Sequence, residues 1–392
     1  MYKIEPSEET IMDTPWNIPY EDRISILKKA KDLSLKTVAY IYPVFDSSTF
    51  RYRGYNMARS LDYGFLFRGA WFSYEDRDSL IEDAASIDLI VLVRCGFDEE
   101  MGEFIDFFKN RKVRIVYDVD DLIYNPEYMP EVRRSLGIKA EADLNFWYGV
   151  TQRYYMVASR CDAYIVTNEY LAQYIRNDFG KKCYVLRNHL NWHQQKVSEE
   201  FFEQKKSGYS SECFKIGYFS GSPTHVKDLS VALPEIGEFM RKHEDAVLEI
   251  YGFMKLSSGY DFFQNEGKIR FKPFRSFVGL QKSYAEVDVN IVPLVDNTFA
   301  NCKSELNYFE SAIVGTITCA SPAYCYKTAI ENGKNGYLCN RGDWFDTLEK
   351  LYSKRGSMDY MDVIRQKSLE EYAEENRHEE IEKVLDEILE GS

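Results

Sequence analysis

The stretch NIVPLVDNTFANCKSELNYFESAIVGTITCASP, residues 290–322, decides how the chain folds. Residues 290–294 are apolar and β-branched, as in a buried parallel strand. A polar loop follows, and apolar residues then recur at helical spacing over 303–314. Gly315 ends this helix, and residues 317–320 start another strand. The strand–loop–helix–strand order predicts an α/β protein built on parallel sheets.

Charged and polar side chains lie at or near the first turns of the predicted helix: Lys303, Ser304, Glu305 and, two turns in, Glu310. A helix N-terminus carries a partial positive charge and free N–H groups that suit a phosphate, and Lys303 adds a cation for the same group. Glu310 can accept hydrogen bonds from a pair of ribose hydroxyls. The stretch therefore favours a nucleotide diphosphate as ligand, and an ordinary strand–helix–strand unit with a charged helix end is the alternative.

The segment KSELNYFESAIVGTITCASP, residues 303–322, resembles the donor-binding signature of GT-B glycosyltransferases, especially the large retaining family four. That family has two glutamates separated by seven residues, and the second holds the ribose. Glu310 matches the second, whereas Cys302 stands where the first is expected. The resemblance implies two Rossmann-like parallel-sheet domains that face a cleft. It also implies a nucleotide-sugar donor as substrate and no cofactor.

The length of 392 residues is too great for one ordinary core and suggests two domains. We expect an N-terminal extension at 1–34 and a Rossmann-like acceptor-side domain at 35–205. A polar linker at 199–212 leads into the nucleotide-sugar-binding domain at 206–355. By the resemblance, the helices of 356–392 cross back to the N-terminal domain.

The composition narrows the possible partners and the location. A net charge of −14 argues against nucleic acid as a partner. The eight cysteines form no CxxC pair and several lie in apolar strand patterns, so we expect buried thiols in a reducing cytoplasm. The first 20 residues are polar, and no apolar run approaches the roughly 20 residues that span a bilayer. We therefore expect a cytoplasmic protein, and the sequence leaves its oligomeric state open.

The first predicted strand, residues 36–42, runs into a loop that carries Arg51, Arg53 and Gly54 before a helix. Loops at the carboxyl ends of strands line ligand clefts in α/β domains. In GT-B enzymes this loop faces the donor phosphates and the acceptor, and arginine suits such anions. Solvated surface charges are the alternative interpretation.

Three carboxylates, Asp118, Asp120 and Asp121, follow the apolar strand predicted at 113–117. Clustered carboxylates at a strand end are costly unless they have a function. In GT-A glycosyltransferases an Asp-x-Asp motif binds a divalent metal, whereas in GT-B relatives a similar run lies beside the cleft without one. The lysine at position 303 favours the second interpretation, so we predict no metal site.

The resemblance also suggests how the reaction runs. Lys303 would stabilise the departing diphosphate. An inverting enzyme would need a base, for which Asp120 and Asp121 are the candidates, whereas in a retaining enzyme the leaving phosphate can take the proton. We expect retention, because the helix that bears Glu310 matches a retaining family.

The second sheet is predicted to open with the strand at 214–219, followed by SGSPTHVKDL. The family usually has an arginine and a lysine here that hold the diphosphate. Gly221 suits the tight turn, and His225 and Lys227 fall near the cationic positions, but the arginine is missing. More of the positive charge is therefore expected from Lys303.

Taken with the resemblance, the sequence predicts a glycosyltransferase that moves a sugar from a nucleotide sugar to a hydroxyl of a glycan or lipid-linked saccharide, in bacterial-type surface polysaccharide synthesis. The aromatic helix predicted at 145–159 leaves open a peripheral contact with the inner face of a membrane. Two alternatives remain open. One is a catalytically silent GT-B subunit that binds a glycan or a partner enzyme, and the other is a GT-B-like nucleotide-sugar epimerase.

Overall fold

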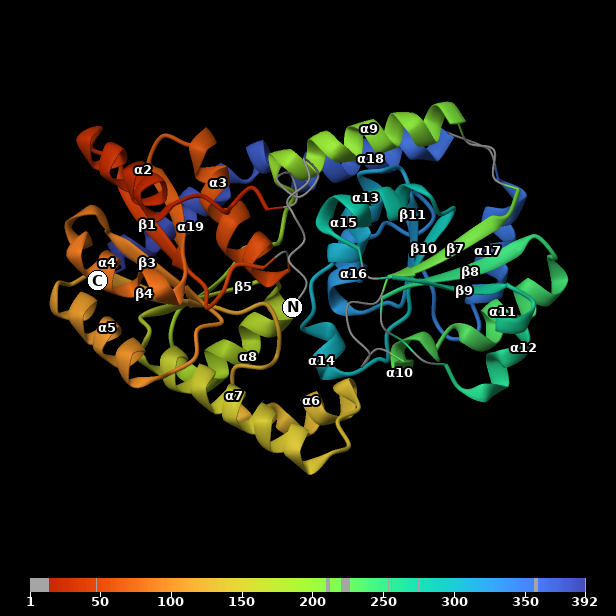
Figure 1. Ribbon diagram of the computed structural model, residues 1–392, viewed down its shortest axis with the longest axis horizontal. Helices are drawn as coiled ribbons and strands as arrows, with labels where there is room; N and C mark the ends of the chain where they lie inside the picture. Colours follow the sequence, from red (N-terminus) through yellow and green to blue (C-terminus); the bar gives the residue numbers. More distant parts are fainter. Residues whose placement is uncertain are drawn as a thin grey trace.

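The computed structural model describes residues 14–46, 48–208, 212–219, 226–252, 254, 256–273, 275–355 and 359–391. Two domains stand side by side, each built on one six-stranded parallel sheet (Figure 1). Alternate residues of a strand enter different cores, because neighbouring side chains point to opposite faces of a sheet. Ala39 and Ile41 lie in one cluster of the N-terminal domain, and Val38 and Tyr40 lie in the other. Each sheet is therefore covered on both faces, and the predicted α/β class is confirmed.

The N-terminal sheet has the strand order β2-β1-β3-β4-β5-β6. Its strands are β1 (Lys36–Ile41), β2 (Phe67–Phe72), β3 (Leu89–Val93), β4 (Arg114–Asp118), β5 (Ala163–Val166) and β6 (Cys183–Val185). Its helices are α2 (Tyr20–Asp32), α3 (Asn56–Ser60), α4 (Arg77–Glu82), α5 (Glu99–Asn110), α6 (Met129–Leu136), α7 (Glu141–Arg160) and α8 (Glu169–Phe179).

The C-terminal sheet has the strand order β12-β11-β10-β7-β8-β9. Its strands are β7 (Phe214–Phe219), β8 (Ala246–Tyr251), β9 (Ile269–Lys272), β10 (Val289–Val292), β11 (Ile317–Ala320) and β12 (Tyr337–Leu338). Its helices are α10 (Val226–Leu229), α11 (Leu233–Lys242), α12 (Asp261–Asn265), α13 (Phe277–Ala285), α14 (Thr298–Asn301), α15 (Leu306–Ala312), α16 (Tyr324–Ala329) and α17 (Trp344–Ser353).

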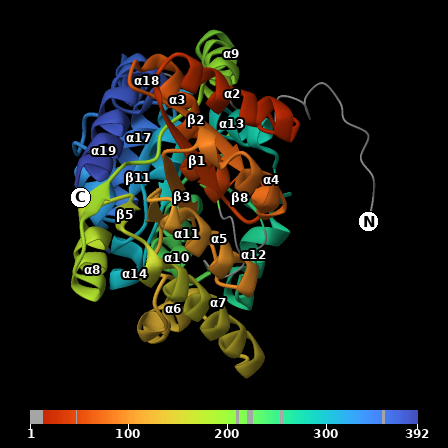
Figure 2. The same ribbon diagram turned by 90° about the vertical axis from the view of Figure 1, so that its left-hand side faces the viewer.

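Two connections join the domains on the same side of the molecule (Figure 1). The helix α9 (Trp192–Gly208) leads from the first domain to the second, and it includes most of the segment expected as a linker. After the second domain, α18 (Asp359–Tyr372) leads back and α19 (His378–Glu390) packs beside α3 and the N-terminal sheet (Figures 1 and 2). None of the helices in the described ranges combines the length and apolar character that a membrane span requires.

The stretch of residues 290–322 contains most or all of β10, α14, α15 and β11 in succession. Its two strands are confirmed, but the helix predicted over 303–314 begins only at Leu306. The short helix α14 ends at Asn301, and the connection between α14 and α15 carries Lys303 and Ser304. These two side chains are thus placed by a bend between helices rather than by a helical first turn.

The sequence pattern does not predict β2, because Arg68 and Gly69 interrupt its apolar residues. A Cβ atom on Gly69 would lie 2.8 Å from the Cα atom of Ala58. The absence of a side chain at Gly69 therefore allows α3 to pack directly on the backbone of β2.

We predict that Gly69→Ala lowers the free energy of unfolding by about 1–3 kcal/mol, because the added methyl group meets backbone atoms that cannot move alone. The matched control is Gly149→Ala on α7, where the new Cβ meets no atom within 4 Å. That variant should gain about 0.5–1 kcal/mol from helix propensity. Urea unfolding measures both, and equal stability of Gly69→Ala and the wild type would contradict the packing account.

Candidate functional site

Two adjoining cavities lie in the cleft where the carboxyl ends of the two sheets meet, and each has a volume of about 260 Å³. Among the described residues, both cavities are lined by Asp120, Phe219, Leu306 and Asn307. The first cavity is lined in addition by residues that include Arg51, Tyr52, Tyr251, Arg275, Phe277, Tyr284 and Glu310. The second is lined in addition by residues that include Arg94, Asp121, Asp228, Lys303, Ser304 and Tyr326.

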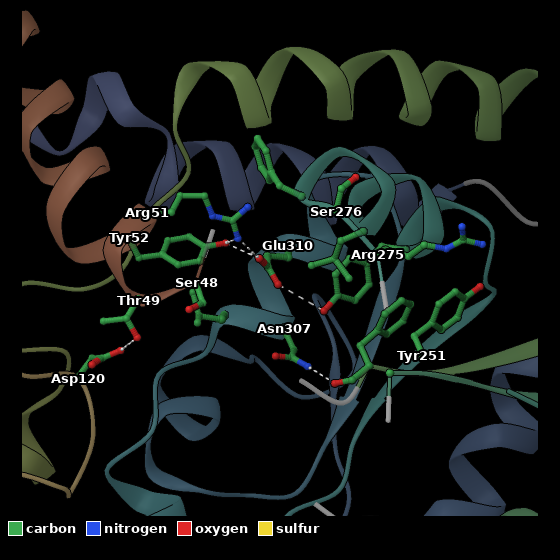
Figure 3. A pocket seen from close by; sticks show the side chains of 16 residues that line it. Ser48, Thr49, Arg51, Tyr52, Asp120, Tyr251, Arg275, Ser276, Asn307 and Glu310 are labelled. Carbon is green, nitrogen blue, oxygen red and sulfur yellow. Dashed lines mark hydrogen bonds and ion pairs between the residues drawn. The ribbon is translucent and has the colours of Figure 1, made fainter. Parts of the chain in front are cut away.

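Glu310 lies in the wall of the first cavity and is bound by three side chains (Figure 3). Its Oε1 atom accepts hydrogen bonds from Arg51 Nη2, at 3.0 Å, and from the hydroxyl of Tyr52. Its Oε2 atom accepts one from the hydroxyl of Tyr284, at 3.4 Å. Burial raises the pKa of Glu310, and the charge of Arg51 opposes that rise. Glu310 of the C-terminal domain is therefore held both by its own domain, through Tyr284, and by the N-terminal domain, through Arg51 and Tyr52.

Arg51 is only 3% exposed and is fixed by stacking. Its guanidinium carbon lies 4.4 Å from the ring centre of Tyr52 and 4.3 Å from that of Phe277. Its Nε and Nη1 atoms are buried and have no hydrogen-bond partner within the described ranges. Arg51 thus connects the N-terminal domain to α13 and Glu310 of the C-terminal domain. Its Nε and Nη1 atoms are still able to donate hydrogen bonds at the cavity wall.

The aromatic side of the first cavity comes from the carboxyl ends of β7 and β8. The rings of Phe219 and Tyr251 are stacked, with centres 4.6 Å apart and planes 8° apart. Tyr284 lies against Phe219 with a centre-to-centre distance of 3.9 Å. These rings offer flat, apolar surface beside the carboxylate of Glu310.

The second cavity brings opposite charges together. Arg94 and Thr49 both donate hydrogen bonds to Asp120, the latter at 3.4 Å. Burial raises the pKa of the neighbouring Asp121, and the charges of Arg94 and Lys303 oppose that rise. Asp120 and Asp121 come from the N-terminal domain and Lys303 from the C-terminal one, and all three line the second cavity.

Solved structures of similar shape match nearly the whole chain. HepE from Anabaena, in complex with UDP, has a TM-score of 0.57 at 11% identity, covering 90% of this chain and 100% of HepE. A glycosyltransferase from Rickettsia africae has a TM-score of 0.60 at 12% identity, covering 91% and 100%. TarM from S. aureus has a TM-score of 0.52 at 15% identity, covering 80% of this chain and 56% of TarM. No protein-family model and no curated protein matches the sequence.

The chain has the GT-B fold. The predicted pair of Rossmann-like domains that face a cleft is confirmed. Both cavities lie between the two domains of this fold, so the cleft is the candidate site. Sequence identities of 11 to 15% indicate a shared fold and nothing about a shared reaction. The chemistry of the site depends on the side chains in the cleft.

Three of the residues predicted on the acceptor or phosphate side are buried in the N-terminal domain and do not line either of the two cavities. Arg53 donates to both carboxylate oxygens of Asp118, at 2.8 and 2.6 Å, and these side chains are 0% and 1% exposed. Gly54 lies in the same π-helical turn, Arg51–Tyr55, packed on Phe50. Their position corrects the expectation of direct contact and makes them part of the wall behind the site.

A chain of hydrogen bonds connects this buried pair to the second cavity. Arg53 donates to Asn188 Oδ1 at 3.1 Å, and Asn188 Nδ2 donates to Ser304 Oγ at 3.0 Å. Ser304 is the neighbour of Lys303 and belongs to the other domain. The buried arginine therefore helps to position the loop that carries the lysine.

Glu305 does not point into either cavity, which corrects its predicted donor-side role. Its carboxylate accepts from Arg187 Nε at 2.7 Å and from the hydroxyl of Tyr372 at 3.0 Å. It also stands at the N-cap of α15, which has only seven residues. The Glu305 side chain makes no capping hydrogen bond to this helix. Among the described lining residues of the second cavity, the cations are Lys303 and Arg94.

The sequence analysis does not predict Arg94 as a site residue, although Arg94 follows directly after β3. Its backbone φ is 45°, in the left-handed region that a non-glycine residue adopts at a cost. The signal was its place at the carboxyl end of an apolar strand, where cleft residues gather in this kind of sheet.

Part of the predicted diphosphate-binding loop lies within the described residues. Gly221 and His225 lie outside the described residues. Lys227 is exposed on α10, and its Nζ atom donates to the backbone carbonyl of Arg134 at 2.9 Å, away from the first two cavities. Its predicted contact with a diphosphate therefore has no support from its position.

The three carboxylates at the end of β4 accept hydrogen bonds from arginines and from a backbone N–H group. Asp118 is bound by Arg53, Asp120 by Arg94, and Asp121 Oδ1 accepts from the backbone N–H of Leu122 at 2.9 Å. Across the described ranges, no group of three or more His, Cys, Asp or Glu side chains could hold a metal ion.

We predict that Asp118→Asn lowers the free energy of unfolding by about 3–5 kcal/mol, because it leaves the buried Arg53 without its counter-charge. The matched control, Asp362→Asn, breaks an exposed pair with Lys206 (59% and 40% exposed) and should cost less than about 1 kcal/mol. Urea unfolding compares the two. A wild-type unfolding temperature that falls sharply in EDTA would instead indicate that Asp118 serves a metal.

Proposed function

We propose that the protein transfers a sugar from a nucleotide diphosphate sugar to a hydroxyl group of a glycan or lipid-linked acceptor. The observation that carries this proposal is the content of the two adjoining cavities. Stacked aromatic rings and a buried carboxylate line the first, and Lys303 with Arg94 lines the second. HepE and the pneumococcal O-GlcNAc transferase GtfA, which have a similar fold, were solved with UDP, and this supports a UDP-sugar as donor.

The donor would extend from the first cavity into the second. Its base would lie against Phe219 and Tyr251, because every base has a flat face that stacks on aromatic rings. Its ribose hydroxyls would donate to Glu310, and its diphosphate would lie near Lys303 and Arg94. A cation that faces the departing diphosphate lowers the barrier, since negative charge develops there during sugar transfer.

Glu310 would have to change partners when the donor binds. Arg51, Tyr52 and Tyr284 occupy both of its oxygens in this structure. Ribose hydroxyls would compete with Arg51 and Tyr52, which belong to the opposite domain. Donor binding would therefore be coupled to a local separation of the two domains at this point.

For nucleotide binding we expect Lys303→Ala and Glu310→Ala each to weaken UDP binding about ten- to hundredfold, as the loss of a charge-assisted hydrogen bond implies. Arg51→Ala should leave the affinity unchanged or raise it, because it removes a competitor for Glu310. Isothermal titration gives the affinities, and the exposed Lys327→Ala on α16 is the matched control. A tenfold weaker Arg51→Ala variant would show that Arg51 binds the nucleotide directly, against the competition account.

Cys302 favours keeping a second function in view. It stands where the resembled family has its first glutamate, it is 0% exposed, and burial raises the pKa of its thiol. It cannot replace a carboxylate at the donor sugar. A GT-B subunit without turnover, or an epimerase acting on the donor sugar, would tolerate this change. Product analysis with UDP-sugars, with and without a saccharide acceptor, separates transfer, epimerisation and binding alone.

For the chemical step we propose retention of the anomeric configuration without a metal, with the leaving phosphate taking the acceptor proton. Asp120→Asn and Asp121→Asn should then each keep substantial activity in EDTA, provided that their unfolding temperatures match the wild type. NMR of the fresh product reports the configuration. A product of inverted configuration, with a loss of about a thousandfold in one variant at unchanged UDP affinity, would assign that aspartate as a protein base.

A further inference from the structure

We propose that a third cavity in the described part of the chain binds the phosphate of an acceptor that is carried on a hydrocarbon chain. This cavity has a volume of about 440 Å³ and lies between the α6–α7 hairpin of the N-terminal domain and α10 of the C-terminal domain. The inference rests on the proposed glycosyl transfer and deepens it by naming the class of acceptor.

The charge of the cavity lining is the first argument. Its basic members are Arg133, Arg134, Lys139 and Lys227, and its described lining contains no acidic residue. The chain as a whole has a net charge of −14, so a lining with only basic charges stands out. Arg134 Nη1 forms an ion pair with Glu131 Oε1 at 3.2 Å, and the Arg134 side chain is 66% exposed. Glu131 does not neutralise the other three cations. A phosphate would gain charge-assisted hydrogen bonds here.

The remaining lining is the second argument. It is mostly apolar and is made by Met129, Pro130, Ile138, Leu144 and Tyr148. Tyr148, which belongs to this lining, is 42% exposed. Phe146, two residues earlier on α7, is 65% exposed. A free acidic glycan needs no such wall, whereas cations beside apolar and aromatic surface suit a phosphate joined to a hydrocarbon. This favours a lipid phosphate over a soluble anion.

The position of the cavity is the third argument. Lys227 lines it, and the next residue along α10, Asp228, lines the second cavity. The helix α6 packs against α14, which leads directly to Lys303 (Figure 1). An acceptor anchored here by its phosphate would thus present its sugar toward Asp120 and Asp121.

A contact between the two domains forms part of this cavity, so the cavity depends on how the domains are arranged. Lys227 Nζ donates to the carbonyl of Arg134 across the domain boundary, at 2.9 Å. An acceptor phosphate would be held by residues of both domains, so it would favour the arrangement in which the donor cavities are also complete.

The test uses dodecyl phosphate below its micelle concentration, titrated into the full chain by calorimetry. We expect wild-type binding that becomes about tenfold weaker or more in Lys139→Glu, and weaker by a smaller factor in Lys139→Gln. Lys139 is exposed, so neither change disturbs a core. The matched control is Lys383→Glu, an exposed lysine on α19, which should bind as the wild type does. Affinity for UDP should be the same in all four proteins.

The other outcomes separate a failure of the third cavity from a failure of the proposed function. Equal binding of dodecyl phosphate by the wild type and Lys139→Glu, with UDP bound normally, removes the third cavity but leaves the proposed function standing. Equal affinity for inorganic phosphate removes the role of the apolar wall, and equal affinity for dodecyl maltoside removes the role of the charge. Binding only to phosphatidylcholine vesicles that contain phosphatidylglycerol, without binding of the monomer, would show a membrane-facing surface instead. Failure to bind UDP with dodecyl phosphate still bound would count against the proposed donor, not against the cavity's phosphate specificity.

Discussion

The buried ion pair of Arg53 and Asp118 is the contact on which the arrangement of the cleft depends. Two charges that are 0% and 1% exposed are costly to remove from water, and they are tolerated only when every donor finds an acceptor. The guanidinium meets both oxygens of Asp118, the carbonyl of Leu186 and the side chain of Asn188. These partners come from the carboxyl ends of β4 and β6, so one side chain fixes two strand ends and, through Asn188, the loop of the other domain.

The turn that contains Arg53 also contains Arg51, whose side chain points toward the C-terminal domain. Arg51 and Arg53 are only two residues apart, yet the first reaches Glu310 in the C-terminal domain and the second stays in its own domain. Both residues lie in the π-helical turn Arg51–Tyr55, and side chains two residues apart on a helical turn point to opposite sides. Arg187 repeats the pattern by binding Glu305 across the domains. Glu305 and Glu310 of the C-terminal domain are thus each paired with an arginine of the N-terminal domain.

Much of the fold follows from local patterns, and most of the exceptions have identifiable physical causes. The apolar, β-branched runs predict β1, β3, β4 and the strands of residues 290–322, because such runs are stable when buried on both faces. In contrast, β2 carries a glycine that only its packing on α3 explains. Of the four residues that the sequence groups as donor-binding, Glu310 lines the first cavity, Lys303 and Ser304 line the second, and Glu305 lines neither. The sequence cannot say that Glu305 turns to Arg187 or that Glu310 meets Arg51, because those partners lie more than a hundred residues away.

The packing of α19 has a consequence for synthesis on the ribosome. Ile381, Leu385 and Ile388 complete one face of the N-terminal core together with Val38 and Tyr40. Glu382 accepts hydrogen bonds from the backbone N–H groups of Leu66 and Phe67, at 2.7 and 3.0 Å, where β2 begins. The N-terminal sheet emerges first, but the part of its apolar face that α19 covers stays exposed until residues 378–390 have left the exit tunnel, after the entire second domain. The nascent chain therefore has a long interval in which chaperones can bind that face, and its two domains mature together rather than in order.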